Sequence, residues 1–216
     1  MKRIIVVTVA LAFVLLSAGA ALAGIKDSKH DMRTHMSSAA TGGYDEVCVY
    51  CHTPHSASTA AQLWNHSVAS TPTYTVYGSA TMNATMGQPG AGSLLCLGCH
   101  DGTVAVDSMV NSPNLGAVGG FNNTTVSSAT KKIISAGANF GTDLSNDHPV
   151  GFAFDNGLFV ADGTLNDPAS IGTTSVRLIS GQVECATCHD AHNTVTMPFL
   201  RSTNQGSQMC LVCHNK

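Results

Sequence analysis

The chain has 216 residues, a formal net charge of −3 and only 11% charged residues. This balance excludes a strongly basic nucleic-acid-binding protein, and no run of lysine or arginine could follow a phosphate backbone. Charged residues make up about 25% of an average globular domain, so their scarcity here favours a surface that is partly covered by partners.

The N-terminus predicts a cleaved signal peptide over residues 1–23. Lys2 and Arg3 precede an apolar run at 4–16, and Ala-Leu-Ala at 21–23 forms a cleavage site. The run is too short to be a membrane span, and no later segment is long and apolar enough. We therefore expect a mature chain of residues 24–216 that forms a single domain. It is exported through the periplasm and secreted, with no membrane span.

The pentapeptide Cys-x-x-Cys-His occurs four times, starting at positions 48, 96, 185 and 210. The cysteines are Cys48, Cys51, Cys96, Cys99, Cys185, Cys188, Cys210 and Cys213, and none is left over. This spacing is typical of covalent haem c, in which both thiols bind the porphyrin and the next histidine binds iron. The sequence therefore predicts four haems c per chain, with His52, His100, His189 and His214 as proximal ligands.

Other uses of these cysteines explain less of the pattern. Paired Cys-x-x-Cys knuckles can bind zinc, and eight cysteines could form disulfides in an exported protein. Neither arrangement requires a histidine after every second cysteine. A thioredoxin-like site is also disfavoured, because no βαβ pattern surrounds any copy.

The remaining sequence predicts a mostly irregular chain with short helices and a few β-hairpins around a haem-organised core. Single helical turns are expected at the motifs, because cysteine and histidine must share one face. Residues 150–160 predict a hairpin with its turn at Asp155-Asn156-Gly157, since Asn-Gly favours two-residue turns. Residues 175–179 and 182–184 predict a second hairpin around Ser180-Gly181.

Six histidines outside the motifs are candidates for the second axial ligand. They are His30, His35, His55, His66, His148 and His192. His55 and His192 each follow a proximal histidine by three residues, so they cannot reach the distal face of the same haem. Each should serve a different haem. Methionine is the other possible ligand, but the surplus of histidines favours a packing role for the methionines.

Several segments resemble the exported tetrahaem c-type cytochromes of metal-reducing bacteria, and most closely the OmcE-like cytochromes that form extracellular nanowires. The segments are Ser-Lys-His-Asp-Met at 28–32, residues 48–55, Leu-Trp-Asn at 63–65, residues 96–104, Asp-His-Pro-Val-Gly at 147–151, residues 185–192 and Phe-Leu-Arg at 199–201. The resemblance implies bis-histidine ligation, with His30, His55, His148 and His192 as distal ligands. It also implies that His55 ligates a haem of the adjacent subunit. His35 and His66 fall outside the pattern and remain alternatives.

These observations predict an electron-transfer protein rather than an enzyme. The leading interpretation is a homopolymer that conducts electrons along an extracellular filament. Its partners would be copies of itself, other redox cytochromes and extracellular electron acceptors. The first alternative is a soluble periplasmic tetrahaem shuttle. A multihaem reductase is less favoured, because it needs an iron with an open position and histidines are in surplus.

Overall fold

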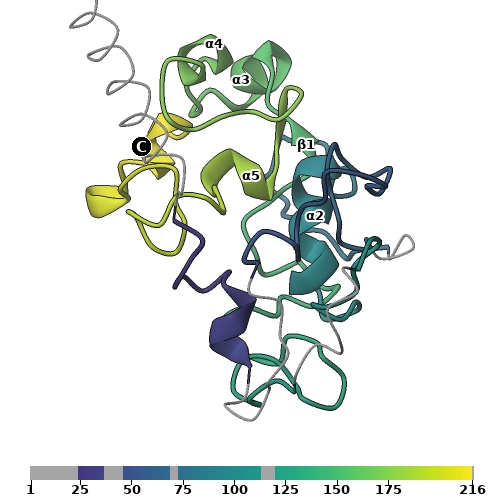
Figure 1. Ribbon diagram of the computed structural model, residues 1–216. Coiled ribbons are helices and arrows are strands. Elements are labelled where there is room, and N and C mark those ends of the chain that lie inside the picture. Colours follow the sequence, from purple (N-terminus) through teal and green to yellow (C-terminus); the bar gives the residue numbers. More distant parts are fainter. Residues whose placement is uncertain (1–23, 37–45, 69–72, 113–119, 216) are drawn as a thin grey trace, which may run out of the picture.

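The computed structural model describes residues 24–36, 46–68, 73–112 and 120–215. The predicted signal peptide lies outside the described residues. The elements are η2 Met32–His35, α2 Ala91–His100, β1 Phe152–Ala153, α3 Asn156–Asp162, α4 Pro168–Ile171, β2 Gln182–Val183, α5 Cys185–Cys188, η3 Gln205–Ser207 and η4 Cys210–Val212. Irregular chain connects them, as predicted. In Figure 1, α2 and α5 lie side by side near the centre, α3 and α4 lie above them, and the purple η2 lies below.

The strands β1 and β2 form an antiparallel pair, with Phe152 opposite Val183 and Ala153 opposite Gln182. The predicted turn at Ser180-Gly181 is confirmed. Both residues have positive φ, 52° and 79°, and Ile179 and Gln182 exchange two backbone hydrogen bonds of 2.9 and 3.0 Å across it. The predicted strand at 175–179 is wrong, because β2 finds its strand partner in β1 instead.

The predicted hairpin at 150–160 is also wrong. Asp155 begins α3 rather than a turn, and its carboxylate accepts a hydrogen bond of 2.9 Å from the Leu158 N–H. The helix ends at Gly163, which adopts the left-handed conformation at φ 68°. An aspartate cap and a terminal glycine are strong helix boundaries, and here they outweigh the local Asn-Gly signal.

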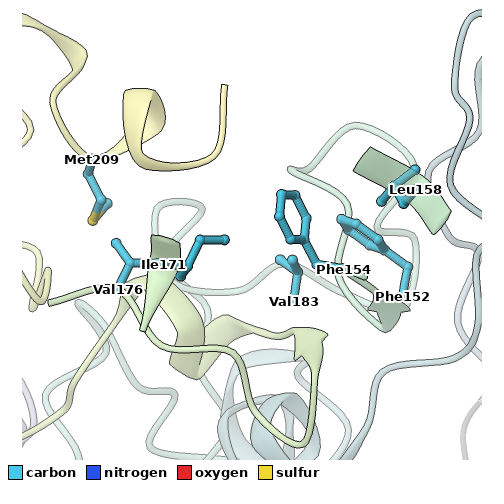
Figure 2. Close-up of a cluster of buried hydrophobic side chains, with 7 residues drawn as sticks. All are labelled: Phe152, Phe154, Leu158, Ile171, Val176, Val183 and Met209. Carbon is cyan, nitrogen blue, oxygen red and sulfur yellow. The ribbon is translucent and has the colours of Figure 1, made fainter. Parts of the chain in front are cut away.

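The apolar core is divided into three clusters. Figure 2 shows the largest, which consists of Phe152, Phe154, Leu158, Ile171, Val176, Val183 and Met209. The second contains Val106, Phe121, Val126 and Ile133, and the third contains Tyr74, Leu97 and Leu144. Motif cysteines border two clusters: Cys188 and Cys213 pack on the first, and Cys99 packs on the second. No helix within the described ranges is long and apolar enough to cross a membrane.

Candidate functional site: the Cys-x-x-Cys-His segments and their histidines

Each motif folds into a tight, hydrogen-bonded turn. The second lies at the end of α2, the third begins with α5 and the fourth with η4. In the first, third and fourth motifs, the backbone N–H of the histidine donates a hydrogen bond to the carbonyl of the first cysteine. The distances are 2.8 Å for His52, 3.0 Å for His189 and 2.9 Å for His214. The predicted helical turns are therefore present at the last three motifs, and the first forms an equivalent turn without being a helix.

The four motifs follow one another in space in the order of the sequence. Burial is the main cause that raises the pKa of several cysteines, and neighbouring thiols are the next cause. The pKa rises to about 11 for Cys51 and to about 12 for Cys96. The interacting thiols join the first motif to the second, Cys96 to Cys185, and Cys188 to Cys210 and Cys213. Thioether sulfurs do not titrate, so these shifts describe free thiols, but the neighbour relations hold for either form.

The cysteines form no disulfides, and no three His, Cys, Asp or Glu side chains in the described part of the chain converge as a metal cluster. A structural zinc site uses four converging ligands. The described residues therefore contain neither a disulfide nor a cluster of the kind that binds structural zinc.

Three imidazole pairs join a motif histidine to a histidine elsewhere in the chain. The ring centroids of His52 and His192 are 6.1 Å apart, with an interplanar angle of 16°. His100 and His30 are 6.0 Å apart at 82°, and His214 and His148 are 6.5 Å apart at 76°. Two imidazoles that bind one metal from opposite sides, through bonds of about 2 Å, have ring centroids about 6 Å apart. The pairs therefore fit the two axial positions of a haem.

His189 and His55 are the two predicted ligands that lack such a partner. Both are exposed, and no second imidazole pairs with either of them among the described residues. The His189 Nδ1 lies 2.9 Å from the Pro198 carbonyl oxygen. Donation from Nδ1 to a carbonyl fixes the ring and leaves Nε2 for a metal, and His100 and His148 make the same contact to Ala138 and Pro149.

His35 and His66 are used differently. Both are buried, and the Nε2 of His35 lies 2.9 Å from the Lys29 carbonyl oxygen. Both nitrogens of His66 face carbonyls, Nδ1 towards Ser67 at 2.6 Å and Nε2 towards Ala105 at 2.9 Å. The Nε2 of His66 also lies 3.4 Å from the Sγ of the motif cysteine Cys99. These contacts join both histidines to the backbone, and no ring contact among the described residues pairs either of them with a motif histidine.

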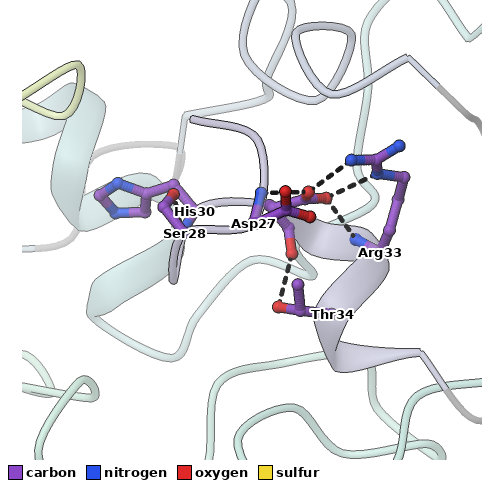
Figure 3. Close-up of polar contacts among 6 residues, drawn as sticks. Asp27, Ser28, His30, Arg33 and Thr34 are labelled. Carbon is purple, nitrogen blue, oxygen red and sulfur yellow. Dashed lines mark hydrogen bonds and ion pairs between the residues drawn. The ribbon is translucent and has the colours of Figure 1, made fainter. Parts of the chain in front are cut away.

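His30 is held by a rigid local structure. Asp31 accepts hydrogen bonds from the Asp27 N–H at 2.8 Å and from the Arg33 side chain, which also forms an ion pair with it (Figure 3). The Phe199 ring stacks on the His30 ring at 4.2 Å. Burial, above all, lowers the pKa of His30 to about 4, so the imidazole is neutral, which is the form that ligates metals.

Two buried polar atoms without hydrogen bonds lie beside paired histidines. One is the Nδ1 of His30 itself, and the other is the indole Nε1 of Trp64, whose ring lies 6.0 Å from the His52 ring. Buried polar atoms, whether donors or acceptors, usually form hydrogen bonds in native proteins. These orphaned atoms, the paired imidazoles and the free thiols together fit the haem c that each motif predicts.

Residues 179–216, which hold the third and fourth motifs, match the family model described as the doubled CXXCH motif. No curated protein sequence matches the chain. The doubled motif indicates covalent haem c, and proteins of this kind are multihaem c-type cytochromes that typically transfer electrons rather than catalyse reactions. The chain is thus similar, over its last two motifs, to multihaem electron-transfer cytochromes.

Proposed function

We propose that the chain carries four covalently bound haems c and polymerises into an extracellular filament that conducts electrons. Haem c supplies one-electron exchange between ferric and ferrous iron. The eight motif cysteines hold the haems, and His52, His100, His189 and His214 are the proximal ligands. This assignment follows from the motif chemistry.

The imidazole pairs support an assignment of the distal ligands. His192 serves the first haem, His30 the second and His148 the fourth, because each ring lies about 6 Å from the motif histidine concerned. His192 is thus assigned to a haem other than that of its own motif. His35 and His66 are left out of this set, because no ring contact among the described residues joins either of them to a motif histidine.

One observation carries the filament proposal: among the described residues, no imidazole ring pairs with His189, and the remaining predicted ligand, His55, is exposed. We infer that His55 ligates the third haem of the adjacent subunit. Such a contact joins two different surfaces, so its repetition without closure produces an open filament. The spatial order of the motifs supports continuous electron transfer from haem to haem along each subunit.

The unpaired His189 is also compatible with a multihaem reductase. In an isolated subunit, the iron bound by His189 would have an open position, which is what a multihaem reductase needs. A monomeric periplasmic shuttle would instead require a sixth ligand from within the chain.

Electron microscopy of the natively matured protein, combined with resonance Raman spectroscopy, separates these functions. We expect filaments in which all haems are low-spin. Monomers with one high-spin haem per chain would support the reductase. Monomers in which every haem is low-spin would contradict the role of His55 and support the shuttle.

A further inference from the structure

A buried carboxylate lies between the second and third Cys-x-x-Cys-His segments. Glu184 immediately precedes α5 and is 2% exposed. Its two carboxylate oxygens accept hydrogen bonds from the Gly90 N–H at 3.0 and 3.2 Å, at the start of α2. The Ser93 hydroxyl donates a further, very short hydrogen bond to Oε2. Both oxygens therefore act as acceptors, which is the pattern of an ionised carboxylate.

The contacts between the two helices are reciprocal. Ser93 belongs to α2, and its Oγ accepts a hydrogen bond of 2.9 Å from the Cys185 N–H in α5. Gly90 has no side chain to cap α2, so the Glu184 carboxylate takes that role. A Cβ at Gly90 would lie 2.5 Å from Glu184 Oε1, so the glycine permits this close approach. One backbone N–H at the start of each helix, that of Gly90 or of Cys185, is thus satisfied by a side chain from the other segment.

Among the described residues, no ion pair joins the Glu184 carboxylate to a cationic side chain. Within the described ranges, the ion pairs involve other acids, and its donors are a backbone amide and a hydroxyl. The positive end of the α2 dipole stabilises the carboxylate without cancelling it. Its field reaches both segments: burial is the main reason why the pKa values of Cys96 and Cys185 are raised, and Glu184 adds to both shifts.

We propose that Glu184 is a positioning and electrostatic residue that, with Ser93, locks the second and third haem segments together and lowers the reduction potentials of their two haems. This inference rests on the proposed binding of haem at these motifs. A nearby negative charge favours ferric over ferrous iron, because the ferric form carries one more positive charge. A unit charge about 12 Å away, at an effective dielectric constant of about 20, changes a one-electron equilibrium roughly tenfold, or about 60 mV.

Spectroelectrochemical titration of the haem-loaded Glu184→Gln variant tests this proposal. Glutamine retains an acceptor for the Gly90 N–H but removes the charge. We expect the potentials of two haems to rise by about 60 mV each, which is roughly tenfold in the equilibrium constant. The other two should stay at their wild-type values. Asp155→Asn is the matched control, because it neutralises the carboxylate that caps α3, where no motif begins. It should leave every potential unchanged.

Ser93→Ala provides a second test with the opposite sign, which does not depend on recovery of the Glu184 variant. It keeps the carboxylate but removes a hydrogen-bond donor that partly offsets the charge. The same two potentials should therefore fall, by a factor of about two to three in the equilibrium constant. Unchanged potentials in Glu184→Gln with full haem content, a uniform shift of all four haems, or a rise in Ser93→Ala would overturn the proposal. A wild-type protein without haem absorption would instead overturn the proposed function itself.

Discussion

Replacing His192 by alanine should expose one additional iron per chain, whatever the state of assembly. The expected number of exposed irons rests on the imidazole pairs: three of the four motif histidines face an imidazole of the same chain, and His192 supplies one of these three. A wild-type filament should therefore bind no carbon monoxide, and a dissociated wild-type subunit should bind one equivalent, at the haem of His189. The His192→Ala variant should bind one equivalent as a filament and two as a monomer.

The His55→Ala variant should behave differently, because its ligand is expected to act across the subunit interface. It should bind one equivalent per chain in every state, and its filaments should be lost or fragile. The assay is a carbon monoxide titration of the dithionite-reduced protein, normalised to total haem and accompanied by electron microscopy. If dissociated wild-type subunits bind no carbon monoxide, or if His192→Ala leaves every haem low-spin, the assignment of distal ligands is refuted.

Three further outcomes are expected. Intact-protein mass spectrometry should show a mature chain that begins at Gly24 with four haem additions, and three or fewer on fully matured protein would contradict the haem count. His35→Ala should assemble normally and keep all haems low-spin, because the His35 Nε2 faces the Lys29 carbonyl. Loss of that buried contact should lower the free energy of unfolding of the variant by about 1–3 kcal/mol. A high-spin haem in this variant would make His35 a ligand. Phe154→Ala should lower the free energy of unfolding, measured by chemical denaturation, by about 3–5 kcal/mol, because Phe154 is 4% exposed in the largest cluster. A loss below about 1 kcal/mol would indicate that this cluster is not a main source of stability.

The local chemistry of the chain could be predicted from the sequence. The spacing of Cys-x-x-Cys-His is itself the feature that haem c attachment needs, so the sequence alone predicts attachment at all eight cysteines and iron ligation by the four motif histidines. The turn at Ser180-Gly181 was also predictable, since two residues with positive φ suffice to form it. The irregular character of the fold followed from the abundance of small and turn-forming residues.

Local signals failed where two of them competed. Asp155-Asn156-Gly157 can form a hairpin turn or begin a helix. Here the helix forms, because the Asp155 carboxylate binds the Leu158 N–H and Leu158 packs into the largest cluster. The packing of Leu158 is a tertiary contact, which the local sequence does not specify.

The tertiary structure decided how distant residues meet. The spacing predicted that His192 would serve a haem other than that of its own motif, but only the path of the chain placed it against His52, 140 positions away. It likewise turned His35 and His66 towards backbone carbonyls, although their residue type is that of the other candidates. The Glu184–Ser93 contact joins residues 91 positions apart and has no sequence motif. Covalent attachment depends on spacing within five residues, whereas axial pairing and the electrostatics between segments depend on packing across the whole chain.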